Sequence, residues 1–153
     1  MRRLSSFVVV GLLLAALAVA VLAPADESGQ PAGTLEALAT ELGLAEPSAF
    51  AATVESVRAN GRLPSDYVRK GEARDLGWRP GSDLCDSAPD RTIGGDRFQN
   101  REGRLPDAPG RQWFEADLDF DCGRRGAKRL VFSNDGLIFV TTDHYESFIE
   151  VPE

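Results

Sequence analysis

Three consecutive segments near the C-terminus carry the hydrophobic pattern of β-strands. Apolar residues occupy the even positions of 113–121, while the odd positions after Trp113 are all acidic. A glycine-containing break separates this segment from a second alternating one at 129–133, and an Asn-Asp-Gly sequence precedes a third apolar run at 137–140. A period of two is typical of strands with one buried face, and short glycine-containing turns join antiparallel neighbours. The pattern predicts an antiparallel meander of three strands.

This meander would carry three chemically active side chains. Glu115 lies on its first strand and Arg129 on its second, and His144, the only histidine in the sequence, follows the third strand. We therefore expect a carboxylate, a guanidinium and an imidazole to converge on one side of a rigid sheet.

Helical spacing precedes the strands. Leucines three and four positions apart favour a helix over 34–45, and a second amphipathic pattern extends over 50–60 before a glycine. Shorter helices are expected at 69–76 and at 82–88. Helices followed by an antiparallel sheet predict an α+β fold, in which N-terminal helices pack on a C-terminal sheet.

The N-terminus has the composition of a secretory signal peptide. Arg2 and Arg3 precede an uninterrupted apolar run at 7–22, and Ala23-Pro24-Ala25 supplies the small residues that a signal peptidase recognises. We expect a signal peptide over 1–25, and a secreted, extracellular product with no stable membrane association after cleavage. The alternative is an uncleaved anchor, although an apolar run of 16 residues is shorter than the roughly 20 that span a bilayer.

An acidic segment, 26–47, follows the predicted signal peptide. Residues 26–33 are polar and contain glycine and proline, as linkers do, and the predicted helix comes next. Two roles remain open for this helix: a removable pro-segment, or an element packed permanently on the domain. The rest of the chain, 48–153, has a size and composition that suit one small domain, which we expect to be a monomer.

The predicted export bears on the redox state of the two cysteines, Cys85 and Cys122. An oxidising compartment allows them to form a disulfide, which would stabilise the fold by about 4 kcal/mol on the chain-entropy model. The alternative is two unpaired buried thiols. One histidine and two cysteines do not supply the four ligands of a structural zinc site, so no metal site is expected.

The charge is unevenly distributed. The formal net charge is −7, yet residues 93–130 contain eight Lys and Arg against seven Asp and Glu. A local field of this kind can favour an anionic ligand while the net charge slows its association. Residues 93–106 are rich in glycine and charge, and by themselves they are more typical of a plain surface connection than of a binding site.

Four segments of the sequence together resemble a known family. They are Gly61–Trp78 (GRLPSDYVRKGEARDLGW), Ile93–Pro106 (IGGDRFQNREGRLP), Gly110–Asp117 (GRQWFEAD) and Thr141–Phe148 (TTDHYESF). In this order, with hardly any gap, they are similar to the secreted bacterial guanyl-preferring ribonucleases of the barnase and binase type. The resemblance implies the microbial ribonuclease fold and an endoribonuclease without metal or other cofactor. Such an enzyme cleaves single-stranded RNA 3′ of guanosine through a 2′,3′-cyclic phosphate, which is then hydrolysed.

The resemblance also implies catalytic roles for five residues. Glu115 corresponds to the general base and His144 to the general acid, while Arg125, Arg129 and Lys70 correspond to the phosphate-binding cations. Metal-free cleavage of RNA needs a base for the 2′-hydroxyl proton and an acid for the departing 5′-oxygen. It also needs fixed cations for the charge that develops on the phosphate oxygens. The residue types therefore agree with the roles that the family assigns.

The resemblance assigns guanine recognition to one loop. Its residues here are Phe98, Gln99, Asn100, Arg101 and Glu102. A carboxylate such as that of Glu102 can accept both N–H donors of guanine, and backbone amides of the loop can donate to O6. Tyr145, next to the predicted acid, is expected to stack on the sugar or base.

Without the family resemblance, the same residues have ordinary interpretations. Glu115 would belong to a solvated acidic strand face, and His144 would be a surface or core residue. Asp117 is expected to be structural in either case, pairing with Arg125 or Arg129. A competing hypothesis for function is a ribonuclease-like domain that binds RNA or a protein with little turnover. The family further implies a cytoplasmic acidic inhibitor resembling barstar.

The sequence departs from the family's pattern at several positions. Arg69 stands where a threonine caps a helix in barnase, Gln99 replaces a serine, and Gly136 replaces a tryptophan. The cysteine pair and the helix predicted at 34–45 are additions. The whole chain is also acidic, whereas barnase is basic. These differences bear on affinity and salt response more than on the mechanism.

Overall fold

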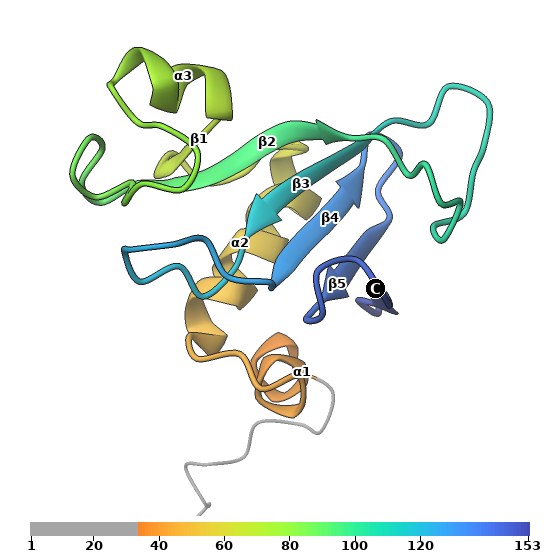
Figure 1. Ribbon diagram of the computed structural model, residues 1–153. Coiled ribbons are helices and arrows are strands. Elements are labelled where there is room, and N and C mark those ends of the chain that lie inside the picture. The colour runs from red at the N-terminus through yellow and green to blue at the C-terminus, as the bar shows by residue number, and fades with distance from the viewer. Residues whose placement is uncertain (1–33) are drawn as a thin grey trace, which may run out of the picture. The chain divides into compact units, whose positions relative to one another are not determined.

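The structure is a computed structural model that describes residues 34–153 (Figure 1). The predicted signal peptide, 1–25, and the linker residues 26–33 lie outside the described residues. Within the described part of the chain, no helix is long and apolar enough to cross a membrane.

Three helices precede or interrupt the first strands: α1 (Leu35–Glu41), α2 (Pro47–Asn60) and α3 (Lys70–Asp75). The side chain of Thr34 accepts a hydrogen bond from a backbone amide in the first turn of α1, and α2 begins at a proline. Gly61 ends α2 in the left-handed conformation, with φ of 64°, which a glycine adopts at little cost. Three of the four predicted helices are confirmed within a few residues.

The six strands form one sheet whose spatial order is the sequence order. They are β1 (Tyr67–Val68), β2 (Thr92–Phe98), β3 (Trp113–Asp117), β4 (Arg129–Ser133), β5 (Ile138–Thr141) and β6 (Ile149–Glu150). β3, β4 and β5 are the predicted antiparallel meander, which is confirmed. The remaining neighbours are also antiparallel except β1 and β2, which pair in parallel. The fold is α+β, as predicted, with this one parallel pair as a difference.

Two sequence-based expectations about local structure are wrong. Residues 82–88 form turns instead of a helix, with Ser87 and Ala88 both donating backbone hydrogen bonds to the carbonyl of Leu84. Residues 93–106 are not a loop throughout, because β2 extends to Phe98. A β-bulge between Gly94 and Asp96 interrupts the regular alternation of β2 and hid the strand from a pattern search.

The first strand of the meander is shorter than predicted, because the chain leaves the sheet after Asp117. Asp119 has a positive φ of 52°, and its carboxylate accepts hydrogen bonds from the amides of Ala45 and Glu46. Its second partner is the ammonium of Lys128, at 2.7 Å, which also donates to the carbonyl of Gly43. Asp119 therefore binds the connection between α1 and α2 to the β3–β4 loop. Because Asp119 turns away to make these bonds, it does not continue strand β3.

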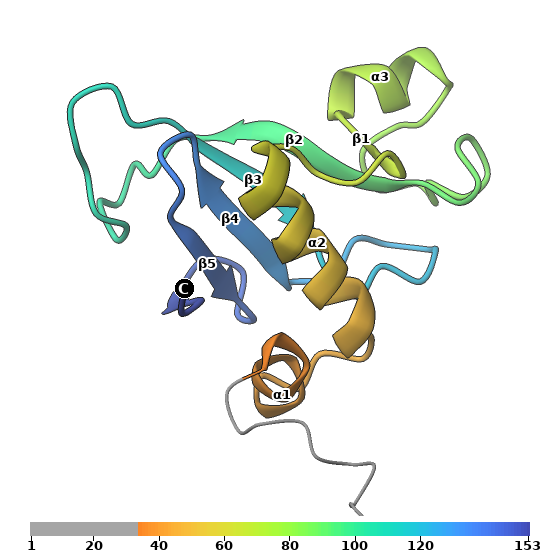
Figure 2. The ribbon, with the colours of Figure 1, turned by 180° about the vertical axis from the view of Figure 1, so that it is seen from behind.

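The main core lies between α2 and one face of the sheet (Figure 2). Phe50, Val54 and Val57 of α2 pack there against Ala116, Leu130 and other apolar residues of β3–β5. Ala39 and Leu44 belong to the same buried cluster. Helix α1 therefore contributes to the core of the domain and is not separate from it.

The other face of the sheet carries a smaller core at one end. Leu105, Trp113, Val131 and Phe139 are buried there, so β3 is covered on both faces. The opposite end of this face holds the polar side chains described below.

The predicted disulfide between Cys85 and Cys122 is present, with a Cα–Cα distance of 5.5 Å. It joins the turns before β2 to the β3–β4 loop, three positions before Arg125. Neither described cysteine is free. The bond closes a sequence separation of 37 residues and restrains the loop that carries Arg125, one of the predicted phosphate-binding arginines.

Candidate active site

The sheet register brings three predicted site residues to the face opposite α2. Glu115 and Asp117 alternate with the core residues of β3, and Arg129 of β4 lies directly opposite Asp117. Glu115 is 7% exposed, Asp117 2% and Arg129 3%. The interpretation of Glu115 as part of a solvated acidic face is therefore wrong. Side chains from α3 and from the loops after β3 and β5 cover this end of the sheet.

Glu115 is held on both of its carboxylate oxygens. The ammonium of Lys70 lies 2.5 Å from Oε1, and the hydroxyl of Tyr145 donates a short hydrogen bond to Oε2. Burial by itself would raise the pKa of Glu115, but the hydrogen bonds from Lys70 and Tyr145 outweigh burial and hold the pKa below its ordinary value. Glu115 is thus a buried carboxylate that is ionised at neutral pH.

Lys70 reaches Glu115 because of where α3 begins. The backbone amide of Lys70 donates to Oδ2 of Asp96 at 2.9 Å, and Asp96 is the register partner of Glu115 on β2. The amide of Arg69 is satisfied by the carboxylate of Glu72 at 2.8 Å. Asp96 therefore supplies from the sheet the helix cap that Arg69 does not provide from its own side chain. It fixes α3, and with it Lys70, against the site.

Asp117 is the anchor of both arginines, as expected. Its two carboxylate oxygens accept bonds of 2.6 Å from Nε and Nη2 of Arg125, the bidentate arrangement that arginine favours. Nε of Arg129 lies 2.9 Å from Oδ1 of Asp117, but its N–H is not aligned with that oxygen, so this contact is mainly ionic. The side chain of Arg125 is 21% exposed and that of Arg129 4%. Of the two arginines, Arg125 is the more accessible.

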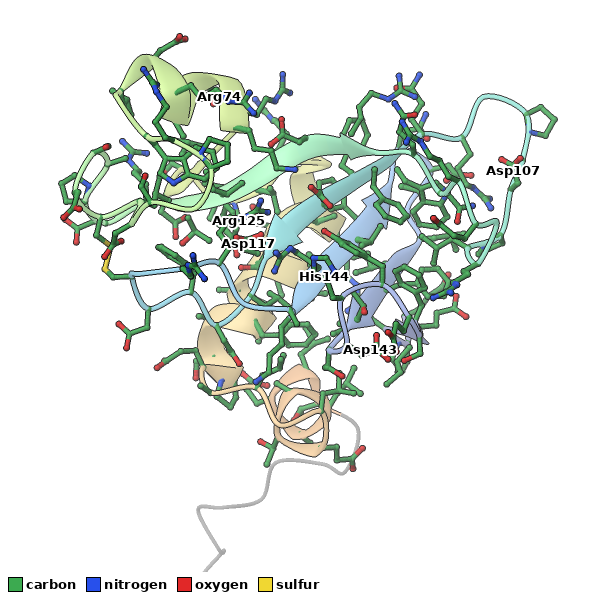
Figure 3. All side chains as sticks on the ribbon, in the orientation of Figure 1. Arg74, Asp107, Asp117, Arg125, Asp143 and His144 are labelled. Carbon is green, nitrogen blue, oxygen red and sulfur yellow. A yellow bond between two sulfur atoms is a disulfide. The ribbon has the colours of Figure 1, made fainter. Side chains whose placement is uncertain are left out.

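His144 lies on the β5–β6 loop and is exposed. His144 and Tyr145 have positive φ values of 58° and 72°, a conformation that non-glycine residues rarely adopt. The hydroxyl of Thr141 accepts the amide of Tyr145 and donates to Asp143, whose carboxylate also binds Ser147. Hydrogen bonds from Ser147 and Thr141 lower the pKa of Asp143 to about 2. Figure 3, viewed from the side opposite α2, shows His144, Arg125 and Asp117 over the open face of the sheet.

The predicted recognition loop contacts the site through Phe98. Its ring stacks on that of Tyr145, with centroids 5.1 Å apart. The side-chain amide of Asn100 donates to the carbonyl of Leu105 and accepts from its amide, so it shapes the loop from within. Arg101 bonds the side chain of Gln99 at 3.3 Å, and both are exposed, as is Glu102. The loop is thus closed on itself and presents its backbone and Glu102 to solvent.

The structure brings Lys70, Glu115, Arg125, Arg129 and Tyr145 into one connected cluster. Several supporting residues escaped the sequence reasoning. They are Asp96, Thr141 and Asp143. A Thr-Thr-Asp sequence before the histidine is a turn signal that could have pointed to the last two, since short polar side chains bond nearby backbone groups. Asp96 of β2 bonds the start of α3, 26 positions earlier in the chain, and leaves no such local signal.

Potential metal ligands are close together at one place in the described residues. Asp83, Cys85 and Cys122 form this group, and the two cysteines are bonded to each other in the disulfide. Their sulfurs are therefore not available as thiolate ligands. This group lies apart from the cluster around Glu115.

Known ribonucleases are similar to this chain in sequence. A ribonuclease of Heyndrickxia coagulans is 52% identical over 91 residues, which are 59% of this chain and 84% of that protein. The ribonuclease of Bacillus intermedius shows the same identity over the same length, but the match covers only 56% of that protein. Guanyl-specific ribonuclease St of Saccharopolyspora erythraea is 46% identical over 55 residues, 35% of this chain and 54% of its own length.

A solved structure of ribonuclease Sa2 with guanosine-2′-cyclophosphate is 26% identical to this chain. It covers 60% of this chain and 89% of its own, with a TM-score of 0.34. A sequence model of the ribonuclease family matches residues 50–152, which include β1–β6 and every predicted site residue. The chain therefore belongs to the ribonuclease family.

Proposed function

We propose that this protein is a secreted, metal-independent endoribonuclease with a preference for guanosine. It cleaves single-stranded RNA on the 3′ side of guanosine by transesterification to a 2′,3′-cyclic phosphate and then hydrolyses that product. The observation that carries the proposal is a buried, ionised Glu115, held by Lys70 and Tyr145, in a cluster of cations beside the loop of His144.

The two protons of the reaction have separate carriers in this proposal. Ionised Glu115 takes the proton of the 2′-hydroxyl, and His144 in its protonated form gives one to the departing 5′-oxygen. Hydrolysis of the cyclic phosphate reverses these roles. The exposed position of His144 suits an acid that must reach a leaving group at the mouth of the site.

The phosphate is stabilised by cations that the protein holds in place before substrate arrives. Asp117 fixes Arg125 and Arg129, so little reorganisation is needed when negative charge develops on the non-bridging oxygens. Lys70 lies against Glu115 and, in this proposal, adds a third cation for the phosphate. Burial of Asp117 keeps both arginines paired with its carboxylate.

Preference for guanosine rests on the loop that begins at Phe98. The internal bonds of Asn100 keep this loop in one conformation, which allows backbone amides to read O6 of guanine. Glu102 is exposed and available to accept the N1–H and N2–H donors. Adenine offers no such pair of donors on the same edge.

The test is cleavage of a short single-stranded RNA with one guanosine, in EDTA, by the chain purified from Asp26 onward. We expect one cut 3′ of that guanosine and a cyclic-phosphate terminus on the upstream product. Binding of the RNA without any cut would favour the competing hypothesis of a binding domain with little turnover. Cleavage that requires an added divalent ion would contradict metal independence.

Replacement of Lys70 by methionine should move the acidic limb of the pH profile. Removal of the ammonium leaves Glu115 buried with only Tyr145 as a close partner, so the pKa of Glu115 rises and less of the base is ionised at a given acidic pH. The acidic limb of kcat/KM should therefore shift to higher pH than in the wild type, in addition to an overall loss of rate. An unmoved limb would show that Lys70 does not control the charge of Glu115.

The proposed partners are single-stranded RNA and an inhibitor resembling barstar. The inhibitor would protect the producing cell before export, and the disulfide and predicted signal peptide are consistent with an extracellular site of action. Co-purification of the protein with the product of a gene for such an inhibitor, and loss of RNA cleavage in the complex, would test this part.

A further inference from the structure

Arg104 joins two loops that the proposed function uses for different purposes. It belongs to the loop after β2, two positions beyond Glu102. Its Nη1 group donates to the carbonyls of Tyr145 and Glu146, at 2.6 Å each, although these residues lie 41 and 42 positions away in sequence. One guanidinium therefore connects the predicted recognition loop to the loop that presents His144.

The recognition side of this connection is rigid. Asn100 bonds both backbone groups of Leu105, and the amide of Gly103 donates to the carbonyl of Asn100. Leu105, next to Arg104, is 3% exposed and packs in the smaller core with Trp113. The backbone at Arg104 is therefore fixed, and the position of the Arg104 side chain depends on the conformation of residues 99–103.

The His144 side of the connection is strained. His144 and Tyr145 are two consecutive non-glycine residues in the left-handed region, a conformation that persists only where the surroundings enforce it. The side chain of Thr141 holds the amide of Tyr145. Arg104 holds the carbonyls that follow His144 at Tyr145 and Glu146. Thr141, at the end of β5, therefore holds the amide of Tyr145, and Arg104, from another loop, holds the carbonyls of Tyr145 and Glu146.

We infer that Arg104 is a positioning residue that couples guanine recognition to the general acid. This inference rests on the proposed function. Guanine bound to the loop adds contacts to the backbone from which Arg104 extends. The bonds from Arg104 connect that backbone to the His144 turn, so the acid is held where the leaving oxygen is. By linkage, the same bonds make the conformation of the His144 turn favour guanine over other bases. Arg104 needs no contact with the substrate for this effect.

The test compares Arg104→Ala, Arg104→Lys and the wild type on the dinucleotides GpC and ApC. Two hydrogen bonds from a charged donor are lost in Arg104→Ala, so kcat on GpC should fall roughly tenfold while KM changes less. The loss on ApC should be smaller, so the preference for guanosine in kcat falls. Arg104→Lys keeps a charged donor and should recover part of the rate. Arg74→Ala, which removes an exposed arginine of α3, is the control for the change of charge.

A second substrate separates positioning of the acid from a general effect on folding. Guanosine 3′-(4-nitrophenyl phosphate) has a leaving group that departs without protonation, so Arg104→Ala should cleave it at nearly the wild-type rate. In a His144→Ala background, Arg104→Ala should cause little further loss on GpC, because the two residues act through one step. Equal losses on both substrates, or additive losses in the double variant, would overturn the inference. Failure of the wild type to cleave GpC would instead refute the proposed function.

Discussion

Replacement of Glu115 or His144 by alanine is expected to lower kcat on an RNA with one guanosine by at least ~10²-fold in each case, because each removes one partner in proton transfer. The effect should be on kcat more than on KM, since Arg125, Arg129 and the recognition loop remain in place. The measurement is steady-state cleavage at the pH optimum of the wild type. Glu150→Ala, which removes an exposed carboxylate of β6, is the matched control and should be as active as the wild type.

The structure predicts that the two substitutions differ in their effect on stability. Glu115→Ala leaves the partly buried ammonium of Lys70 without its partner and frees the hydroxyl of Tyr145. It should therefore change stability, whereas His144→Ala removes an exposed side chain and should not. Because both residues serve one reaction, the double variant should be little slower than the slower single variant. Wild-type activity in either single variant would contradict the assignment of base and acid.

Loss of the disulfide is expected to lower the free energy of unfolding by about 4 kcal/mol, since the bond between Cys85 and Cys122 closes a separation of 37 residues. For a domain of this size the melting temperature of the double serine variant should fall by roughly 10–20 °C. Well below that temperature the variant should keep most of its activity, because the bidentate bonds from Arg125 to Asp117 still hold the loop. Thermal unfolding followed by circular dichroism measures the first effect, and cleavage at low temperature measures the second.

A reducing agent provides the control for this experiment. Dithiothreitol should lower the melting temperature of the wild type toward that of the double serine variant and leave the variant unchanged. A wild type whose melting temperature is the same with and without the reducing agent would show that the bond contributes little to stability. Loss of activity at low temperature in a folded variant would show that the disulfide, and not Asp117, positions Arg125.

Local patterns in the sequence were sufficient for the elements whose structure is local. The alternation along β3–β5 and the glycine after α2 predicted strands and a helix end that the structure confirms. The β2 strand was missed because two glycines interrupt its pattern. A side chain at Gly94 would lie 2.5 Å from Cδ1 of Tyr67 and 2.8 Å from Cδ1 of Leu63, so glycine is required there by a neighbour that the pattern does not reveal.

The chemical residues could be named from sequence because the motifs around them resemble a known family, and the structure then showed what surrounds them. The acidic alternation of β3 by itself indicated a solvated face. Glu115 is instead covered by Lys70, 45 positions earlier, and by Tyr145, 30 positions later. Residues this far apart in sequence are brought together only by the sheet and its loops. A hydrophobic period along the chain gives no information about such contacts.

The sequence by itself determined the fold class and the presence of two cysteines suited to a disulfide, and it predicted residues for a base, an acid and phosphate-binding cations. Only the tertiary structure decided that Glu115 is buried and ionised, that one carboxylate, Asp117, anchors both arginines, and that Arg104 connects two loops. The physical reason is that burial and ion pairing depend on the surroundings of a side chain in space. These surroundings set its charge state and its mobility, whereas helical and strand periods depend on neighbours in the chain.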